Sequence, residues 1–125
     1  MTFRHFFPLW PPSVNHTWRS AGKTYLAPQV REFRRSMQAE MLIARAQRAF
    51  PKEPLTGPLS VEMRFYPPTR QRRDLDNLAK CPLDAFTYCG LWLDDSQVTD
   101  LHMLICESAP EGGFWVCIRR LGEKE

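Results

Sequence analysis

No long hydrophobic run occurs in the 125-residue sequence, whose apolar stretches are only a few residues long. A membrane-spanning helix needs roughly 20 consecutive apolar residues, so we expect none here. The N-terminal stretch, MTFRHFFPLWPP, contains aromatic residues but no small-residue cleavage site, which argues against a signal peptide. The length is also too short for two ordinary domains. We therefore expect a single cytosolic (cytoplasmic) domain over residues 1–125, with a frayed tail at about 122–125.

Paired metal ligands are also absent. The four cysteines form no CxxC pair, and the three histidines are scattered along the chain. A structural zinc site needs paired ligands close in sequence, so the spacing excludes one. A disulfide between Cys106 and Cys117 would require that the two face each other across a hairpin. Buried, reduced thiols are more common in a domain of this kind, and we expect them here.

Neither sign of charge dominates the chain, because 17 Lys and Arg against 14 Asp and Glu leave a net charge of +3. The charge is nevertheless unevenly placed. Residues 1–80 carry 14 basic and 6 acidic side chains, whereas residues 81–125 carry 3 and 8. This asymmetry fits either an ordinary solvated surface or a polyanion-binding face beside a cluster of carboxylates.

Hydrophobic spacing predicts a strand, a long helix, a second strand, a short helix and a hairpin. A β-prone run near the N-terminus ends at the prolines 11–12, and a loop with a short extended piece at residues 24–26 follows. Pro28 suits the first turn of a helix over residues 29–50. The apolar residues of that helix recur every three or four positions and form a core-facing stripe: Val30, Phe33, Met37, Met41 and Ala44.

Alternation of apolar and polar residues over positions 59–66 predicts a half-buried strand. Residues 98–107 and 114–121 alternate again on either side of a turn-rich SAPEGG link, which predicts a β-hairpin. The expected fold class is α+β, a mixed β-sheet with two helices packed on it.

Acidic residues gather at the ends of the predicted elements. Asp74 and Asp76 stand two residues apart, and in an extended backbone their side chains point the same way. Two such charges repel each other unless a cation holds them or one is protonated. Asp94 and Asp95 form a second acidic pair just before the strand that begins at residue 98. We expect the two pairs to meet in space as a hard-oxygen site, which suits Mg²⁺.

Two other interpretations of these acids can be tested on the sequence. In an EF-hand loop starting at Asp74, the glycine position would fall on Ala79 and the bidentate glutamate position on Ala85, so that pattern fails. Asp76 or Asn77 could instead cap the following helix. Capping explains one residue, and it leaves the acid pair, the neighbouring arginines and the second acidic pair unexplained.

Basic residues flank the first acidic pair. Arg70, Arg72 and Arg73 precede it directly, and Lys80 follows Asp76 by four residues, which is one helical turn. Lys80 would form either a surface ion pair with that carboxylate or a cation beside a metal. Phosphodiester cleavage requires cations that hold a backbone phosphate next to a metal that activates water.

The run RRDLDNLAKCPLDAFTYCGLWLDDSQV closely resembles the signature region of RusA-type Holliday junction resolvases, with its DxDN–xx–K core and its DDSQV element. The N-terminal stretch LWPPSVNHTWR is similar to the PPSxN loop of the same family. The order of elements between these motifs also fits, so the resemblance covers most of the chain. It implies a small homodimeric, Mg²⁺-dependent endonuclease that resolves four-way DNA junctions by paired symmetric nicks in DNA recombination and repair.

The resemblance also implies roles for individual residues. Asp74, Asp76 and Asp95 would bind the metal and carry catalysis, with Mg²⁺ as the ion and Mn²⁺ as a substitute. Lys80 would be the catalytic lysine, which assists the deprotonation of water or stabilises the charged transition state. Asn77 matches the motif and has a supporting role.

DNA contacts are expected from two loops that grip backbone phosphates and so fix position rather than sequence. The loop residues concerned are Asn15, His16, Arg19, Arg70, Arg72 and Arg73, and Lys80 is expected to contact DNA as well. A four-way junction offers two symmetry-related strands, which matches a two-fold homodimer with two sites.

Pro82 complicates the predicted helix, because it lacks the N–H that a helix already running from Asp76 would use. Either residues 76–80 form a separate turn before a helix that starts near Cys81, or the helix is kinked. A separate turn would weaken the expectation that Lys80 and Asp76 share a helical face.

Two other functions stay open. One is a catalytically silent junction-binding protein of the same fold, and the complete acid set with Lys80 argues against it. The other is a nuclease that acts on flaps, forks or other branched DNA. Motifs do not separate this nuclease from a junction resolvase, because the metal chemistry is identical and the selectivity lies in the dimer geometry.

Overall fold

The computed structural model describes residues 2–12, 17–20, 23–26 and 28–122, with only the backbone of residues 17–20 and 23–26. Its strands are β1 (Thr2–Phe7), β2 (Thr17–Ser20), β3 (Lys23–Leu26), β4 (Leu59–Tyr66), β5 (Val98–Ile105) and β6 (Gly113–Arg120). Its helices are α1 (Pro28–Ala46), α2 (Leu75–Tyr88) and the short 3₁₀ helix η2 (Asp95–Gln97). Over the described ranges, no helix has the length and apolar content that a membrane crossing requires.

Four strands form one mixed sheet in the order β1-β6-β4-β5. β6 is antiparallel to both β1 and β4, whereas β5 runs parallel to β4. The α+β prediction is confirmed, but the predicted hairpin of residues 98–107 and 114–121 is wrong, because β4 lies between these two strands. Alternation identifies the face that a strand buries and does not identify its neighbours. β4 buries every second side chain completely, as suits a strand with a partner on each edge.

The link between β5 and β6 crosses the end of β4 instead of turning back beside β5. The N–H of Cys106 donates to the carbonyl oxygen of Phe65 at 2.7 Å, and the N–H of Ala109 donates to that of Pro67 at 2.9 Å. All four cysteines are free thiols, as expected, but only Cys81 is buried, and the other three are half-buried. The hairpin that a disulfide between Cys106 and Cys117 would have needed does not form.

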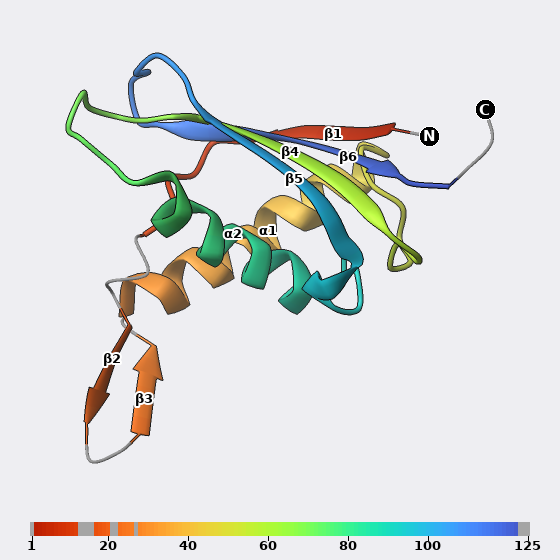
Figure 1. The fold of residues 1–125 in the computed structure, drawn as a ribbon, viewed down its shortest axis with the longest axis horizontal. Helices are drawn as coiled ribbons and strands as arrows, with labels where there is room; N and C mark the ends of the chain where they lie inside the picture. The colour runs from red at the N-terminus through yellow and green to blue at the C-terminus, as the bar shows by residue number, and fades with distance from the viewer. Residues whose placement is uncertain (1, 13–16, 21–22, 27, 123–125) are drawn as a thin grey trace.

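Both long helices cover the same face of the sheet (Figure 1). α1 buries the predicted stripe, which is therefore confirmed: Val30, Phe33, Met37, Met41 and Ala44. The helix ends at Ala46, short of the predicted residue 50, and Arg48 adopts a left-handed φ of 63° just beyond it. α1 packs against β1, and α2 packs against β5 at the other edge of the sheet.

Aromatic rings fill the core between the sheet and the helices. Phe7 stacks on Phe114 with 5.1 Å between ring centroids, and Phe86 of α2 meets Phe7 edge-on at 5.5 Å. All three rings are fully buried, and burial of a phenyl ring is worth roughly 2 kcal/mol. This packing fixes where α2, and hence the residues at its two ends, lie relative to the sheet.

β2 and β3 form a separate antiparallel pair that projects away from the sheet and the helices (Figure 1). The sequence predicted only the extended piece at residues 24–26. Its partner strand lies within a polar stretch that carries no alternating apolar pattern.

Candidate active site

Asp74 and Asp76 lie at the N-terminal end of α2. Asp74 is the N-cap residue, with an extended backbone (φ −97°, ψ 127°) and no side-chain capping hydrogen bond. Asp76 stands in the first turn, where its Oδ1 accepts the N–H of Asn77 at 3.0 Å. The interpretation that Asp76 or Asn77 is the N-cap residue is therefore wrong. Both carboxylates are exposed, and the positive end of the helix dipole stabilises negative charge at this position.

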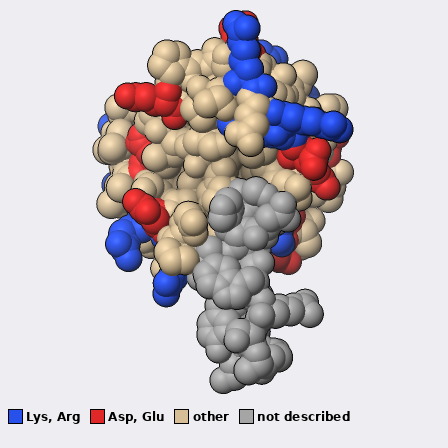
Figure 2. Space-filling model, turned by 90° about the vertical axis from the view of Figure 1, so that its left-hand side faces the viewer, with Lys and Arg blue, Asp and Glu red and all other residues tan. Residues whose placement is uncertain are grey.

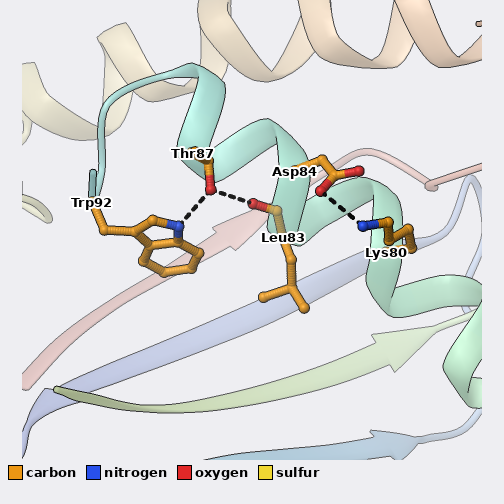
Figure 3. A network of polar contacts seen from close by, with 5 residues as sticks. All are labelled: Lys80, Leu83, Asp84, Thr87 and Trp92. Atoms are coloured by element: carbon orange, nitrogen blue, oxygen red, sulfur yellow. Dashed lines mark hydrogen bonds and ion pairs between the residues drawn. The ribbon is translucent and has the colours of Figure 1, made fainter. Parts of the chain in front are cut away.

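α2 runs without a break from Leu75 to Tyr88, with Pro82 inside it. The alternative of a separate turn at residues 76–80 is therefore wrong, and Asp76 and Lys80 share one helical face. Lys80 does not pair with Asp76, however. Its Nζ lies 3.4 Å from Oδ1 of Asp84, one turn further on (Figure 3). This ion pair holds an exposed ammonium group on the same helical face as the Asp76 carboxylate.

The far end of α2 is anchored to the loop that follows it. The Trp92 Nε1–H donates to the Thr87 hydroxyl oxygen at 2.7 Å, and that hydroxyl donates to the carbonyl oxygen of Leu83 at 3.2 Å (Figure 3). Trp92 is itself fully buried. The C-terminal end of α2 therefore has a fixed position, and so does the loop that leads to the second acidic pair.

Arg73 braces the loop that precedes Asp74. Its Nη1 donates to the carbonyl oxygens of Thr69 and Gln71 at 2.9 and 2.8 Å, and its Nη2 donates to the Thr69 hydroxyl at 2.8 Å. The guanidinium group also lies over the Trp10 ring, 5.2 Å from the centroid. Because an arginine has five N–H donors, Nε and one N–H of Nη2 are left without a hydrogen-bond partner among the described residues.

Arg70 and Arg72 in the same loop are exposed, and no ion-pair partner is seen for either among the described residues. Figure 2 looks onto this end of the molecule and shows basic and acidic side chains next to one another on its surface. Such a mixture suits a site where carboxylates hold a cation while nearby arginines hold an anion.

The two residues of the second acidic pair, Asp94 and Asp95, differ in their contacts. Asp94 is the N-cap residue of η2 and forms a capping box with Gln97. The Ser96 hydroxyl donates to the Asp94 carboxylate and, as the largest cause, holds the pKa of Asp94 below its usual value. Asp95, the first residue of η2, is half-buried and contributes to the same shift through weaker hydrogen bonds to the Asp94 carboxylate. Asp94 is therefore the acid that caps η2, and the role of Asp95 as a metal ligand stays a prediction.

The two acidic pairs do not meet within one chain. α2 separates them, and a helix of 14 residues is about 20 Å long. Asp74 and Asp76 lie at one end of it, and η2 with Asp95 lies beyond the other (Figure 1). In the part of the chain that the structure describes, no three His, Cys, Asp or Glu side chains are grouped as a metal ion requires. The expected convergence is therefore not found in a single protomer.

The predicted DNA-binding loop near the N-terminus is only partly covered. Asn15 and His16 lie outside the described residues. Arg19 belongs to β2, and only its backbone is described. These three DNA contacts remain predictions.

Two residues that position the site were missed in the sequence. Gln97 could have been found, because Asp94 followed three residues later by Gln is the pattern of a capping box. Trp10 carries no such signal, since its contact with Arg73 joins residues that are 63 positions apart and depends on the tertiary fold.

Comparisons with known proteins point to one family. The model of the family described as endodeoxyribonuclease RusA matches residues 8–113. The crossover junction endodeoxyribonuclease rusA of Enterobacteria phage 82 is 31% identical and aligns over 99% of this chain and 100% of its own length. The proteins of the same name from Escherichia coli strain K12 and Shigella sonnei strain Ss046 are 32% and 31% identical, each over 92% of both chains.

Proposed function

Because the chain belongs to the RusA family of endodeoxyribonucleases, we propose that it cuts four-way (Holliday) DNA junctions by paired symmetric nicks, in DNA recombination and repair. The observation that carries this proposal is the N-terminal end of α2. Two exposed carboxylates, those of Asp74 and Asp76, stand there directly after an arginine-rich loop, and Lys80 follows Asp76 by one turn. We place the protein in the cytoplasm, where phage and bacterial DNA is processed.

The chemistry of the donors fits a hard divalent cation. Asp74 and Asp76 present carboxylate oxygens, which suit Mg²⁺, and Mn²⁺ as its substitute. When bound, Mg²⁺ would activate water and neutralise charge on the scissile phosphate. Arg70 and Arg72 bind the neighbouring backbone phosphates. Lys80, which Asp84 holds in place, donates to the phosphate as negative charge develops on it.

A complete metal site requires a second copy of the chain. One protomer supplies Asp74 and Asp76 at one end of α2, and Asp95 lies about 20 Å away beyond the other end. In a two-fold dimer whose α2 helices run antiparallel, each end of one helix faces the opposite end of the other. Asp95 of the partner subunit then completes the site that Asp74 and Asp76 begin, and the dimer holds two such sites.

The edge of β5 is the surface that fits this dimer. β5 is a terminal strand of the sheet, so one row of its backbone N–H and C=O groups lacks a strand partner among the described residues. It also exposes three large apolar side chains, Leu101, Leu104 and Ile105. The other terminal strand, β1, contributes no exposed large apolar side chain to the described surface.

Antiparallel pairing of β5 with its copy would also place the acids correctly. η2 leads directly into the start of β5, and the loop from β4 enters α2 near the end of β5, because β4 and β5 are parallel. The start of the partner's β5 would lie beside the end of this one. Asp95 of the partner subunit would therefore come to the end of the sheet where Asp74 stands.

The direct test is cleavage of a synthetic immobile four-way junction beside a linear duplex and a flap, with and without Mg²⁺. We expect symmetric nicks in the junction alone, and only when Mg²⁺ is present. Equal cleavage of the flap would favour a general nuclease for branched DNA. Junction binding without any cleavage would favour a catalytically silent binding protein.

The matched variant in this assay is Asp76→Asn, which removes one charge and keeps the shape of the side chain. It should bind the junction at least as tightly as the parent, because repulsion from the phosphates falls, and it should not cut. Cleavage by Asp76→Asn at the parental rate would refute the role assigned to this carboxylate.

A further inference from the structure

The sheet face opposite the helices carries aromatic and basic side chains in register. This open face consists of the outward side chains of β1, β6, β4 and β5, and neither long helix covers it (Figure 1). One row across all four strands reads Phe6, Trp115, Arg64 and Leu104. The Trp115 side chain, on a central strand, is 42% exposed. A solvated sheet face has no packing reason to keep a tryptophan at its centre.

The aromatic side chains of the open face are held in place by their neighbours. The Phe6 ring lies 5.6 Å from the Trp115 ring at an angle of 55°. It occupies the space above Gly113, where any Cβ atom would collide with it. Tyr66 pairs with Gly113 from the adjacent strand. The missing side chain at Gly113 therefore makes room for the Phe6 ring beside Trp115. These two rings form an aromatic cluster, and Tyr66 lies on the same face one strand away.

Beside this cluster is a shallow hollow of about 330 Å³, lined by Arg4, Glu62, Arg64, Tyr66, Trp115, Val116 and Cys117. Arg64 is paired with Glu62 at 3.1 Å. Arg4 is exposed and has no ion-pair partner among the described residues. The hollow thus joins an exposed indole ring to a free guanidinium group.

The remaining charges of the open face leave it slightly basic. Asp100 is paired with His102 at 3.1 Å and accepts the Ser60 hydroxyl at 2.7 Å. Arg119 lies in the row of Asp100 and acts electrostatically on it. Three arginines, Arg4, Arg64 and Arg119, therefore face two carboxylates.

We propose that the open face binds single-stranded DNA, with bases stacked on Trp115 and its neighbouring rings and a backbone phosphate held by Arg4. Exposed aromatic rings combined with arginine are the means by which proteins hold unpaired strands, because every base has a π-face. In a duplex the base faces are stacked on one another, so they are not accessible to the aromatic rings of the protein. The Glu62 carboxylate can accept hydrogen bonds from exocyclic amino groups of unpaired bases.

The open face lies close to the candidate active site along the chain. Tyr66 is the last residue of β4, and the loop that follows leads to Asp74 within eight residues. A DNA strand that extends from the carboxylates of Asp74 and Asp76 can pass over this loop to the aromatic rings of the open face. This path rests on the proposed function, whereas single-strand binding by the open face does not.

The test is fluorescence anisotropy of a labelled oligothymidylate of about 15 nucleotides, titrated with full-length protein in the absence of divalent cations. Trp115→Ala should weaken binding about tenfold, whereas Trp115→Phe should stay close to the parent because it keeps a ring. Arg4→Ala should weaken binding and lower its salt dependence by about one phosphate contact. Leu42→Ala, at a 72% exposed position on α1, is the matched control and should bind normally.

The result that overturns the proposal is oligothymidylate binding that is absent in the parent or equal in the parent, Trp115→Ala and Arg4→Ala. Arg4→Ala provides a second, independent test if Trp115→Ala does not fold. Junction cleavage with Mg²⁺ is measured on the same proteins. If the parent protein cuts junctions but does not bind the oligonucleotide, only single-strand binding by the open face is refuted. If it binds the oligonucleotide but does not cut junctions, only the proposed function is refuted.

Discussion

The side-chain amide of Gln97 donates to the carbonyl oxygen of Leu55 at 2.9 Å and so ties η2 to the chain that precedes β4. Its Oε1 accepts the backbone N–H groups of Leu93 and Asp94. Gln97 and Asp94 together fix the backbone on both sides of Asp95. The position of Asp95 is thus set mainly by the contacts of its neighbours.

Substitutions in the second acidic pair should therefore separate structure from catalysis. Asp95→Asn should lower junction cleavage more than about a hundredfold, because it removes a metal ligand, and should leave the urea midpoint of unfolding unchanged. Asp94→Ala should lower that midpoint, because it removes the cap and its bond with Ser96. Equal losses of cleavage and of stability in both variants would contradict the division of roles.

The proposal that the β5 edge is the dimer interface can be tested by introducing a charged side chain there. Leu101→Lys should give a monomer in sedimentation velocity and abolish junction cleavage, because the metal site needs two copies. Leu42→Lys, on the exposed side of α1, should stay dimeric and active. Circular dichroism spectra should be the same for both variants. An active, dimeric Leu101→Lys protein would rule out this edge as the interface.

Stability should fall in mildly acidic solution because of His5. Burial holds the pKa of His5 below its ordinary value of 6.5, and the Glu40 carboxylate opposes this shift only in part. The His5 Nε2 atom is buried without a hydrogen-bond partner among the residues that the structure describes, and the ring packs edge-on against Phe7. The unfolded chain takes up the proton more readily than the folded one. Stability is therefore present above pH 6.5 and is lost as the pH falls below that value.

The measurement is the free energy of unfolding in urea over this pH range. His5→Phe, which suits the aromatic surroundings of Phe7 and Phe50, should flatten the pH dependence. His102→Gln, at an exposed position, is the control and should keep the parental slope. A His5→Phe protein with the parental slope would show that another group is responsible.

Local pattern was sufficient for much of the fold. The stripe from Val30 to Ala44 and the alternation over residues 59–66 predicted α1 and β4, because burial of a helix face or a strand face follows directly from spacing. The partners of β5 and β6 could not be predicted in this way. Register and neighbour choice depend on the loop at residues 106–112, which crosses β4 through contacts that no local period encodes.

The candidate site was likewise predictable in its chemistry and not in its geometry. The motif identified the acidic residues, but it did not show whether the two acidic pairs lie close together in one protomer. The unbroken course of α2 through Pro82 sets Asp74 and Asp95 at opposite ends of one helix. The spacing left Lys80 either an ion pair with Asp76 or a place beside the metal, and Lys80 pairs with Asp84 instead. Both carboxylates lie one turn from Lys80, so spacing alone does not decide between them.

Co-purified heterodimers, isolated with two different tags, test the composite metal site most directly. One chain carries Asp76→Asn and the other carries Asp95→Asn. Each variant alone is inactive, because both of its sites lack one ligand. In the heterodimer, one site combines both defects, while the other joins the intact Asp76 of one chain to the intact Asp95 of its partner. The composite site predicts that the heterodimer regains Mg²⁺-dependent nicking, of one strand per junction. A heterodimer as inactive as the two single-variant homodimers would show that each chain builds its own site. That result would contradict the composite metal site.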